Sequence, residues 1–231
     1  MRLFLFDIDG TLISARGLGR AAFKCAFERV FGTAGALDQY DLRGKTDPRI
    51  VHDVIGAAGF SREAIEARVA ECFGVYVREL EALLGDGSVV RVMPGIAELV
   101  GALAERRDAV VGLLTGNIEA GAHLKLRPTG LLPRFSVGAF GSDDIDRRRL
   151  PFIARERARG LTGHDFAFDR VTIIGDTPHD VDCARACGAV AVAVATGQYA
   201  AAELAGCSPD LLFDDFADVE RGLEALTNGA V

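Results

Sequence analysis

Short apolar runs alternate with longer amphipathic stretches along most of this chain. Residues 3–6 (Leu-Phe-Leu-Phe) are apolar at every position, which is typical of a strand in a parallel sheet covered on both faces. Further runs of this kind predict strands at 110–114, 135–140, 171–174, 190–194 and 211–213. Helices are predicted between them at 96–106, 118–126, 150–159 and 180–187. Strands that alternate with helices indicate right-handed crossovers and a mainly parallel α/β sheet.

Residues 14–92 interrupt this alternation with a helical pattern. In the first part, apolar residues recur at helical spacing, at Phe23, Phe27, Val30 and Phe31. Two or more further helices are predicted over 47–58 and 61–84, where Ser61 is a favourable helix start. We therefore expect two domains, a core of residues 1–13 and 93–231 and a helical insert of residues 14–92.

Two carboxylates stand at the end of the first predicted strand. Asp7 and Asp9 directly follow residues 3–6, and Gly10 allows a tight turn. In α/β sheets, ligands bind at the carboxyl ends of the strands. Asp and Gly also cap strands and open loops without any chemical role. That interpretation explains one Asp and the Gly, but not the second acid.

More carboxylates follow the predicted strand at 171–174, namely Asp176 and Asp180. If this strand lies beside the first, three or four carboxylates converge on one spot. Carboxylates crowded together repel one another unless a positive charge joins them. Mg²⁺, a hard divalent cation that prefers oxygen ligands, would neutralise this repulsion. For Asp180, capping of the following helix is an additional or alternative role.

A third strand end carries neutral polar groups. Thr115, Gly116 and Asn117 follow the apolar run 110–114. A hydroxyl, a glycine that allows close backbone approach, and an amide together suit the binding of phosphate oxygens. Asn117 is also a residue type favoured at helix starts, so it either binds phosphate or caps the following helix.

Composition and charge narrow the class of partner. The chain has 231 residues, a net charge of −7 and 49% apolar residues. An acidic balance disfavours nucleic acid and anionic membrane as partners, and no apolar stretch is long enough to span a bilayer. The N-terminus is predicted to run straight into a strand, so we expect no basic and apolar leader. We expect a cytoplasmic monomer or homodimer with reduced thiols at Cys25, Cys72, Cys183, Cys187 and Cys207.

Three of these motifs, in order and across essentially the whole chain, resemble a known family. DIDGT at 7–11, TGN at 115–117 and GDTPHD at 175–180 resemble motifs one, two and four of the haloacid dehalogenase superfamily, especially its phosphoglycolate phosphatase-like hydrolases. The resemblance implies a Rossmann-like core with strand order 3-2-1-4-5. It also implies that residues 14–92 are an α-helical cap, which closes over the active site.

The resemblance also implies roles for the motif residues. Asp7 is expected to be the nucleophile that forms an aspartyl phosphate, and Asp9 the general acid and then base. Dehalogenases of the superfamily lack the second acid, so Asp9 indicates phosphoryl transfer. The metal ligands are expected to be Asp7, Asp9 through its backbone carbonyl, Asp176 and, through an orienting role, Asp180. Phosphate is expected to contact Ile8, Asp9, Thr115, Gly116 and Asn117.

The third motif departs from the family pattern. A lysine is usual before the fourth strand, but here three arginines, Arg147, Arg148 and Arg149, stand in that region. Arginine can also offset phosphate and carboxylate charge, and it grips phosphate through two hydrogen bonds. Arg147 is the preferred candidate from its DRxxL-like context, with the other two as alternatives. Lys125 is expected on a helix surface.

One segment of the insert carries candidate substrate contacts. Residues 42–47 (Leu-Arg-Gly-Lys-Thr-Asp) resemble the substrate-facing G-x-T-D segment of the family. Arg43, Lys45 and, just beyond, Arg49 either meet an anionic substrate or form a solvated face of the cap.

The sequence therefore predicts a Mg²⁺-dependent phosphatase for small phosphorylated metabolites, such as phosphoglycolate or sugar phosphates. The alternatives are a phosphomutase of the β-phosphoglucomutase type, which uses the same carboxylates, and a non-catalytic protein that binds phosphometabolites. A non-catalytic protein would be expected to lose Asp7 or Asp9, and this chain has both.

Overall fold

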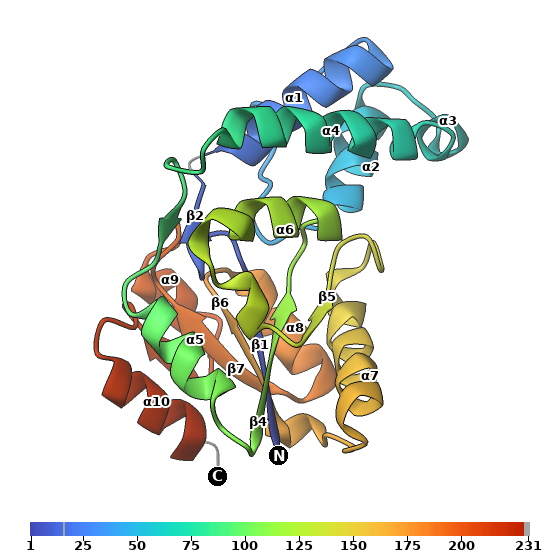
Figure 1. Cartoon of the computed structure of the whole chain (residues 1–231). Coiled ribbons are helices and arrows are strands. Elements are labelled where there is room, and N and C mark those ends of the chain that lie inside the picture. Colours follow the sequence, from blue (N-terminus) through green and yellow to red (C-terminus); the bar gives the residue numbers. More distant parts are fainter. Residues whose placement is uncertain (16, 229–231) are drawn as a thin grey trace.

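A six-stranded parallel sheet forms the centre of the computed structural model (Figure 1), in the order β5-β4-β1-β6-β7-β8. The structure describes residues 1–15 and 17–228; residue 16 of the expected insert and residues 229–231 of the expected core lie outside the described part. The strands are β1 (Arg2–Phe6), β4 (Ala109–Leu114), β5 (Val137–Ala139), β6 (Val171–Gly175), β7 (Val190–Val194) and β8 (Leu211–Phe213). The predicted parallel α/β sheet is confirmed. Numbered one to five along the chain, the core strands β1, β4, β5, β6 and β7 have the expected order 3-2-1-4-5, and β8 adds one strand beyond β7.

Strand β5 is shorter than the predicted run 135–140. Phe135 closes a 3₁₀ turn by donating its N–H to the Leu132 carbonyl, and the Phe140 N–H turns to the Asp143 carboxylate. Both ends of the apolar run therefore belong to loops. Apolar character alone did not separate these loop residues from the strand between them.

Helices cover both faces of the sheet because β1 is apolar on both sides. Phe4 and Phe6 pack into one apolar cluster and Leu3 and Leu5 into another. The first cluster takes in residues of α5 (Ile96–Ala104), α6 (Glu119–Leu126) and α10 (Val219–Asn228). The second takes in residues of α7 (Leu150–Thr162), α8 (Pro178–Cys187) and α9 (Ala201–Ala205). Short 3₁₀ turns lie at Arg127–Thr129, Leu132–Arg134, Arg147–Arg149 and Phe168–Arg170.

Four helices lie above the carboxyl ends of the strands (Figure 1) and share an apolar cluster of their own. They are α1 (Leu18–Phe31), α2 (Asp47–Ala57), α3 (Arg62–Glu66) and α4 (Val69–Leu84). Phe23 of α1 stacks on Tyr76 of α4 with ring centroids 4.2 Å apart. Ser61 caps α3 by accepting the Ala64 N–H at 3.2 Å, as its position in the sequence predicted.

The chain enters and leaves this helical layer through two adjacent strands that the sequence did not predict. Strand β2 (Ile13–Ser14) pairs antiparallel with β3 (Arg91–Val92), so that Ile13 lies opposite Val92 and Ser14 opposite Arg91. A further hydrogen bond joins the Met93 N–H to the Leu12 carbonyl.

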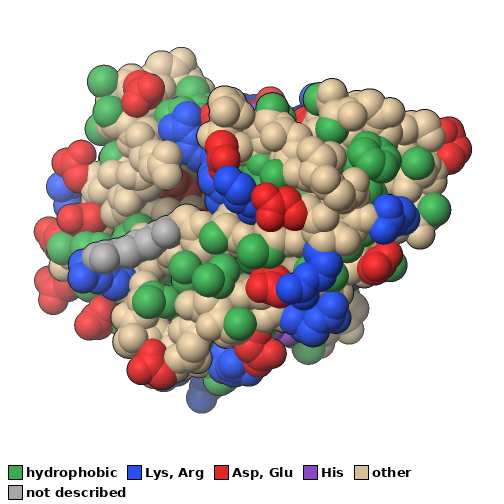
Figure 2. All heavy atoms as spheres, turned by 90° about the horizontal axis from the view of Figure 1, so that it is seen from above, with side chains coloured by type: hydrophobic (Ala, Val, Ile, Leu, Met, Phe, Trp, Pro, Cys, Tyr) green, Lys and Arg blue, Asp and Glu red, His purple; other side chains and the backbone are tan. Residues whose placement is uncertain are grey.

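The outer face of the helical layer carries mixed charge. Viewed from above, basic and acidic side chains are intermingled with apolar ones (Figure 2). Among the described residues, no helix combines the length and apolar character needed to cross a membrane.

Candidate active site

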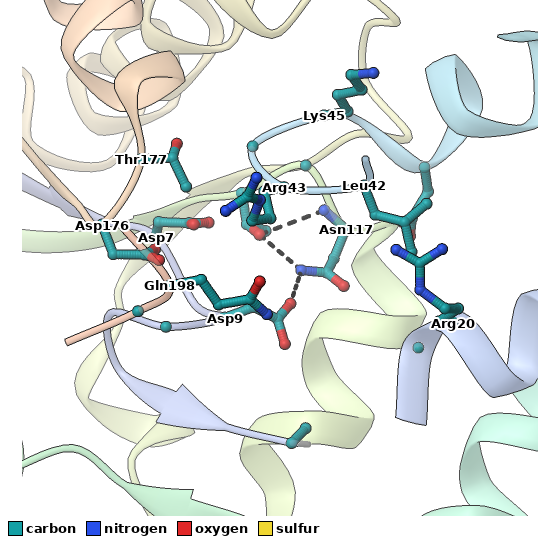
Figure 3. Close-up of a pocket in the computed structure, with 18 of the residues that line it drawn as sticks. Asp7, Asp9, Arg20, Leu42, Arg43, Lys45, Asn117, Asp176, Thr177 and Gln198 are labelled. Atoms are coloured by element: carbon teal, nitrogen blue, oxygen red, sulfur yellow. Dashed lines mark hydrogen bonds between the residues drawn. The ribbon is translucent and has the colours of Figure 1, made fainter. Parts of the chain in front are cut away.

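A cavity of about 360 Å³ lies between the carboxyl ends of the strands and the helical layer (Figure 3). Most of the predicted site residues line it, namely Asp7, Asp9, Thr115, Gly116, Asn117, Arg147 and Asp176. Ile8 is instead buried in the apolar core beneath the site, and Asp180 lies behind the cavity wall. The structure thus brings together residues separated by more than half of the chain.

Strand pairing places Asp7 beside Asp176. Phe6 of β1 lies opposite Ile174 of β6, and the Asp7 N–H donates to the Ile174 carbonyl at 2.9 Å. Gly10 adopts φ 89°, and a Cβ atom there would lie 2.3 Å from Asp176 Oδ2. A glycine is therefore needed both for the backbone conformation and for the close approach.

Three buried carboxylates form a potential metal site. Oxygens of Asp7, Asp176 and Asp180 lie within 4.8 Å of one another. The pKa of Asp7 is raised to about 6 and that of Asp176 to about 8, chiefly by burial and in part by the neighbouring carboxylates. Arg147 offsets part of the rise in the pKa of Asp7. Repulsion of this kind among oxygen-only donors fits a hard divalent cation, which would stabilise the ionised forms.

Arg147 is the arginine that reaches these carboxylates. Its Nη2 lies 2.5 Å from Asp180 Oδ1 and 3.2 Å from Asp7 Oδ1. Burial alone would lower the pKa of Arg147, but the two carboxylates raise it well above its ordinary value. Arg148 and Arg149 pair instead with Asp146 and Asp144 on the surface, where their side chains are 57% and 72% exposed.

Asp180 supports both Arg147 and the start of α8. Its Oδ1 accepts from Arg147, and its Oδ2 accepts from the N–H and hydroxyl of Thr177 at 3.0 and 2.7 Å. Thr177 is therefore the N-cap of α8 and Asp180 the third residue of a capping box, which corrects the expectation of Asp180 as N-cap. With both oxygens engaged, Asp180 is placed to orient its neighbours. His179, in the first turn of α8, is exposed and lies against Gly44.

Thr115 and Asn117 form the polar wall opposite Asp7. The Thr115 hydroxyl oxygen accepts from the Asn117 side-chain amide at 2.9 Å and its backbone N–H at 3.3 Å, which leaves the hydroxyl proton available to the cavity. The same amide donates to Asp9 Oδ2 at 2.7 Å (Figure 3). The alternative that Asn117 caps α6 is wrong, because the N-cap is Ile118, without a side-chain hydrogen bond.

Lys125 is the clearest correction to the sequence analysis. Its side chain is only 5% exposed, and its Nζ lies 2.6 Å from both Asp9 Oδ2 and Asn117 Oδ1. Helix α6 explains this position, because the side chains of a helix point back toward its N-terminus, and Asn117 lies directly before the N-cap of α6. The available signal was the presence of this lysine on the helix that directly follows Thr115 to Asn117.

Asp47, which the sequence analysis did not single out, joins the helical layer to the second motif. Its backbone N–H donates to the Gly116 carbonyl and its Oδ2 accepts the Ile118 N–H, each at 2.7 Å. Next to it, the Thr46 hydroxyl donates to the Ile145 carbonyl at 2.8 Å. The segment that resembles G-x-T-D therefore holds α2 against the loop that carries Thr115 to Asn117.

The three candidate cations of this segment have different surroundings. Arg43 and Lys45 line the cavity, whereas Arg49 forms an exposed pair with Asp53. The Arg43 guanidinium lies 4.3 Å from the centre of the Tyr199 ring, and Lys45 Nζ lies 3.8 Å from that of Tyr40. Because they line the cavity, Arg43 and Lys45 lie where an anionic ligand can reach them.

The buried Asp47 carboxyl makes stability depend on pH. Burial raises its pKa to about 7, although Lys125 and the Ile118 N–H lower it. A raised folded-state pKa stabilises the protein at acid pH, and this stability is lost as the pH rises through about 7. We expect the advantage of the wild type over Asp47→Asn in thermal unfolding to shrink between about pH 4.5 and 7, by a few kcal/mol, and to stay constant above about pH 8. Each unit of pKa shift is worth about 1.4 kcal/mol.

The matched control is Asp53→Asn on the same helix. Burial raises the pKa of Asp53, but hydrogen bonds from Tyr40 and Arg49 outweigh it and hold the pKa below its ordinary value. Its effect on stability should therefore be flat over the same pH range. An Asp47→Asn difference that is constant or grows with pH would contradict the assignment.

Comparisons with known proteins agree with this geometry. A family model described as haloacid dehalogenase-like hydrolase matches residues 4–185. The chain is 28% identical to a phosphoglycolate phosphatase of Synechococcus elongatus over 98% of each chain, and 30% identical to that of Rhodospirillum rubrum over 93% of this chain and 88% of the relative. A putative β-phosphoglucomutase from Bacteroides vulgatus has the same fold, with a TM-score of 0.72 at 19% identity, over 100% of this chain and 90% of the neighbour. The chain belongs to the haloacid dehalogenase-like hydrolase family, which confirms the superfamily expected from the motifs.

Proposed function

We propose that this protein is a Mg²⁺-dependent phosphatase that hydrolyses small phosphorylated metabolites through an aspartyl phosphate on Asp7. The observation that carries the proposal is the position of Asp7, a buried carboxylate between Arg147 and the polar wall of Thr115, with Asp9 two residues on. The relatives named phosphoglycolate phosphatase support this class of substrate. The small cavity supports a small leaving group.

The proposed reaction has two steps. Asp7 attacks phosphorus and the bond from phosphorus to the leaving oxygen breaks, while Asp9 gives its proton to that oxygen. Asp9 then takes a proton from water, the resulting hydroxide attacks phosphorus, and the Asp7 carboxylate is released. Asp9 is left deprotonated by the first step, so it can act as the base in the second step, and one residue serves both.

Donors around Asp7 would hold the phosphoryl oxygens. Arg147 and the Thr115 hydroxyl face the cavity, and we assign the backbone N–H groups of Ile8, Asp9 and Gly116 to the same task. Asp7, Asp176 and the Asp9 carbonyl would hold Mg²⁺, with Asp180 orienting them. When bound, Mg²⁺ would neutralise the crowded carboxylates and the developing charge on the phosphoryl group.

We also propose that residues 14–92 form a cap domain on a core of residues 1–13 and 93–231. The apolar cluster that the helical layer has of its own supports this division. The hydrogen bonds of Thr46 and Asp47 to the core hold the layer over the site. A closed layer excludes water from the first step and surrounds the leaving group. The free cysteines support a cytoplasmic location.

Phosphate release tests the proposal. We expect Mg²⁺-dependent release from a panel of 2-phosphoglycolate, glucose 6-phosphate, β-glucose 1-phosphate and 4-nitrophenyl phosphate. EDTA should lower the rate by about 100-fold or more, and added Mg²⁺ should restore it. Conversion of glucose 1-phosphate into glucose 6-phosphate without phosphate release would instead identify a mutase. Saturable binding of these esters without either reaction would identify a binding protein.

A further inference from the structure

Lys125 is a buried charge that the proposed reaction does not yet use. The sequence has only three lysines, at 24, 45 and 125, among 26 basic residues. Elsewhere arginine dominates, but an ammonium group is more compact and its three donors rotate freely. A charge this deeply buried is costly unless it is paired and hydrogen-bonded. Its partners therefore indicate why a lysine stands here.

Both partners of Lys125 belong to the site. Its Nζ donates to Asp9 Oδ2 and to Asn117 Oδ1, each at 2.6 Å, and Asn117 Nδ2 donates to the same Asp9 oxygen at 2.7 Å. Because an ammonium only donates and a carboxylate only accepts, the orientation of the Asn117 amide is fixed. The three side chains close a ring of hydrogen bonds around one oxygen of Asp9.

The second oxygen of Asp9 has a different environment. Among the described residues, none donates a hydrogen bond to Asp9 Oδ1. The Asp9 side chain is 43% exposed, whereas that of Lys125 is 5% exposed and lies where α6 packs against α4. Lys125 is thus held in place by the packing around it. If the Lys125 side chain were removed, the more exposed Asp9 carboxylate could rotate.

We propose that Lys125 is a positioning residue, which holds Asp9 by Oδ2 so that Oδ1 faces the leaving oxygen of the substrate. The inference rests on the proposed function, in which Asp9 transfers protons. In the first step the proton passes from Asp9 Oδ1 to the leaving oxygen as the bond to phosphorus breaks, and Lys125 keeps its three protons throughout. Misplacement of a reacting group by about 1 Å costs about 100-fold in rate.

Leaving groups of different basicity test this inference. An alkoxide must be protonated as it leaves, whereas 4-nitrophenolate leaves without a proton. We expect Lys125→Met to lower kcat/KM about 100-fold for 2-phosphoglycolate and for ethyl phosphate. For 4-nitrophenyl phosphate we expect less than about a fivefold loss. The ratio kcat/KM is used because it reports the steps up to departure of the leaving group.

Ethyl phosphate separates positioning from substrate binding, because it lacks the carboxylate of 2-phosphoglycolate. A loss confined to 2-phosphoglycolate would show that Lys125 binds that carboxylate, and an equal loss on all three esters would show a structural role. Either result overturns the inference. Lys24→Met, which removes an exposed lysine paired with Asp38, is the control and should leave all three values unchanged.

Two further variants keep the test informative. If Lys125→Met does not fold, Lys125→Gln and Lys125→Arg are compared, since both retain a donor. For each variant, kcat/KM for ethyl phosphate is divided by kcat/KM for 4-nitrophenyl phosphate. This ratio should fall more in Lys125→Gln, whose donor is uncharged, than in Lys125→Arg. The reverse order would overturn the inference. If the wild-type protein hydrolyses none of the esters, the proposed function itself is wrong. If the wild type is active, the losses in the Lys125 variants test the role of Lys125 alone.

Discussion

Turnover is expected to disappear in Asp7→Asn, while the fold stays intact. An amide cannot attack phosphorus as a carboxylate does, so kcat should fall by at least about 10⁴-fold. The substitution is nearly isosteric and removes one of three crowded carboxylates. The pKa of Asp7 is raised to about 6, chiefly by burial, so its ionised form is costly in the folded protein. Arg147 also pairs with Asp180, at 2.5 Å in the wild type, and this ion pair should persist in the variant. The midpoint of thermal unfolding should therefore stay within a few degrees of the wild type.

Two measurements check this expectation. Phosphate release gives the loss of turnover, and mass spectrometry of rapidly quenched wild-type enzyme should find a phosphoryl group on the peptide that contains Asp7. The matched control is Asp182→Asn, which alters an exposed acid in α8 and should retain full activity. Full activity of Asp7→Asn, or a phosphoryl group on another residue, would refute the nucleophile assignment.

The second large effect is expected at Arg147. Arg147→Ala should lower kcat/KM by about 10² to 10³-fold, because a preorganised cation beside the phosphoryl group is lost. It also leaves Asp7 and Asp180 without their ion pair, and breaking a buried pair costs about 3–5 kcal/mol. Arg149→Ala, at a side chain that is 72% exposed, should change kcat/KM by less than about threefold.

Stability and activity must be separated for this residue. Unfolding midpoints of both variants are measured first, and activity is then compared well below the lower midpoint. Arg147→Lys keeps the charge but loses the planar fork, so it should retain more stability than Arg147→Ala while remaining impaired. A larger loss in Arg149→Ala than in Arg147→Ala would move the role of the third motif to another arginine.

The sheet and the strand-end motifs could be predicted because each follows from a local pattern. Residues 3–6 are apolar on both faces, and this alone indicates a covered parallel strand that ends at Asp7. The acids at 176 and 180 follow a second such strand, and parallel pairing brings the two strand ends together. The preference for Arg147 came from its sequence context, and burial now separates it from Arg148 and Arg149.

What the sequence did not reveal depends on contacts between distant segments. Lys125 looks like an ordinary helix-surface lysine, and only the packing of α6 against α4 buries it. Asp47 looks like a helix-start acid, yet its carboxylate holds a backbone N–H of another element. Strands β2 and β3 are two residues each, too short for any apolar alternation to appear.

The pairing of β2 with β3 has a consequence for how proteins of this architecture can diversify. Because the chain departs at Ile13 and returns at Val92 on hydrogen-bonded neighbours, the ends of the intervening segment are already adjacent. Any folded segment whose own ends meet can take its place at a similar cost in loop-closure entropy. The register of β1, and with it the position of Asp7, does not depend on what that segment is. The junction is therefore a site at which a different insert can replace the helical layer while the core stays unchanged. A new insert would bring different side chains to the cavity and so change the substrate that the core can accept.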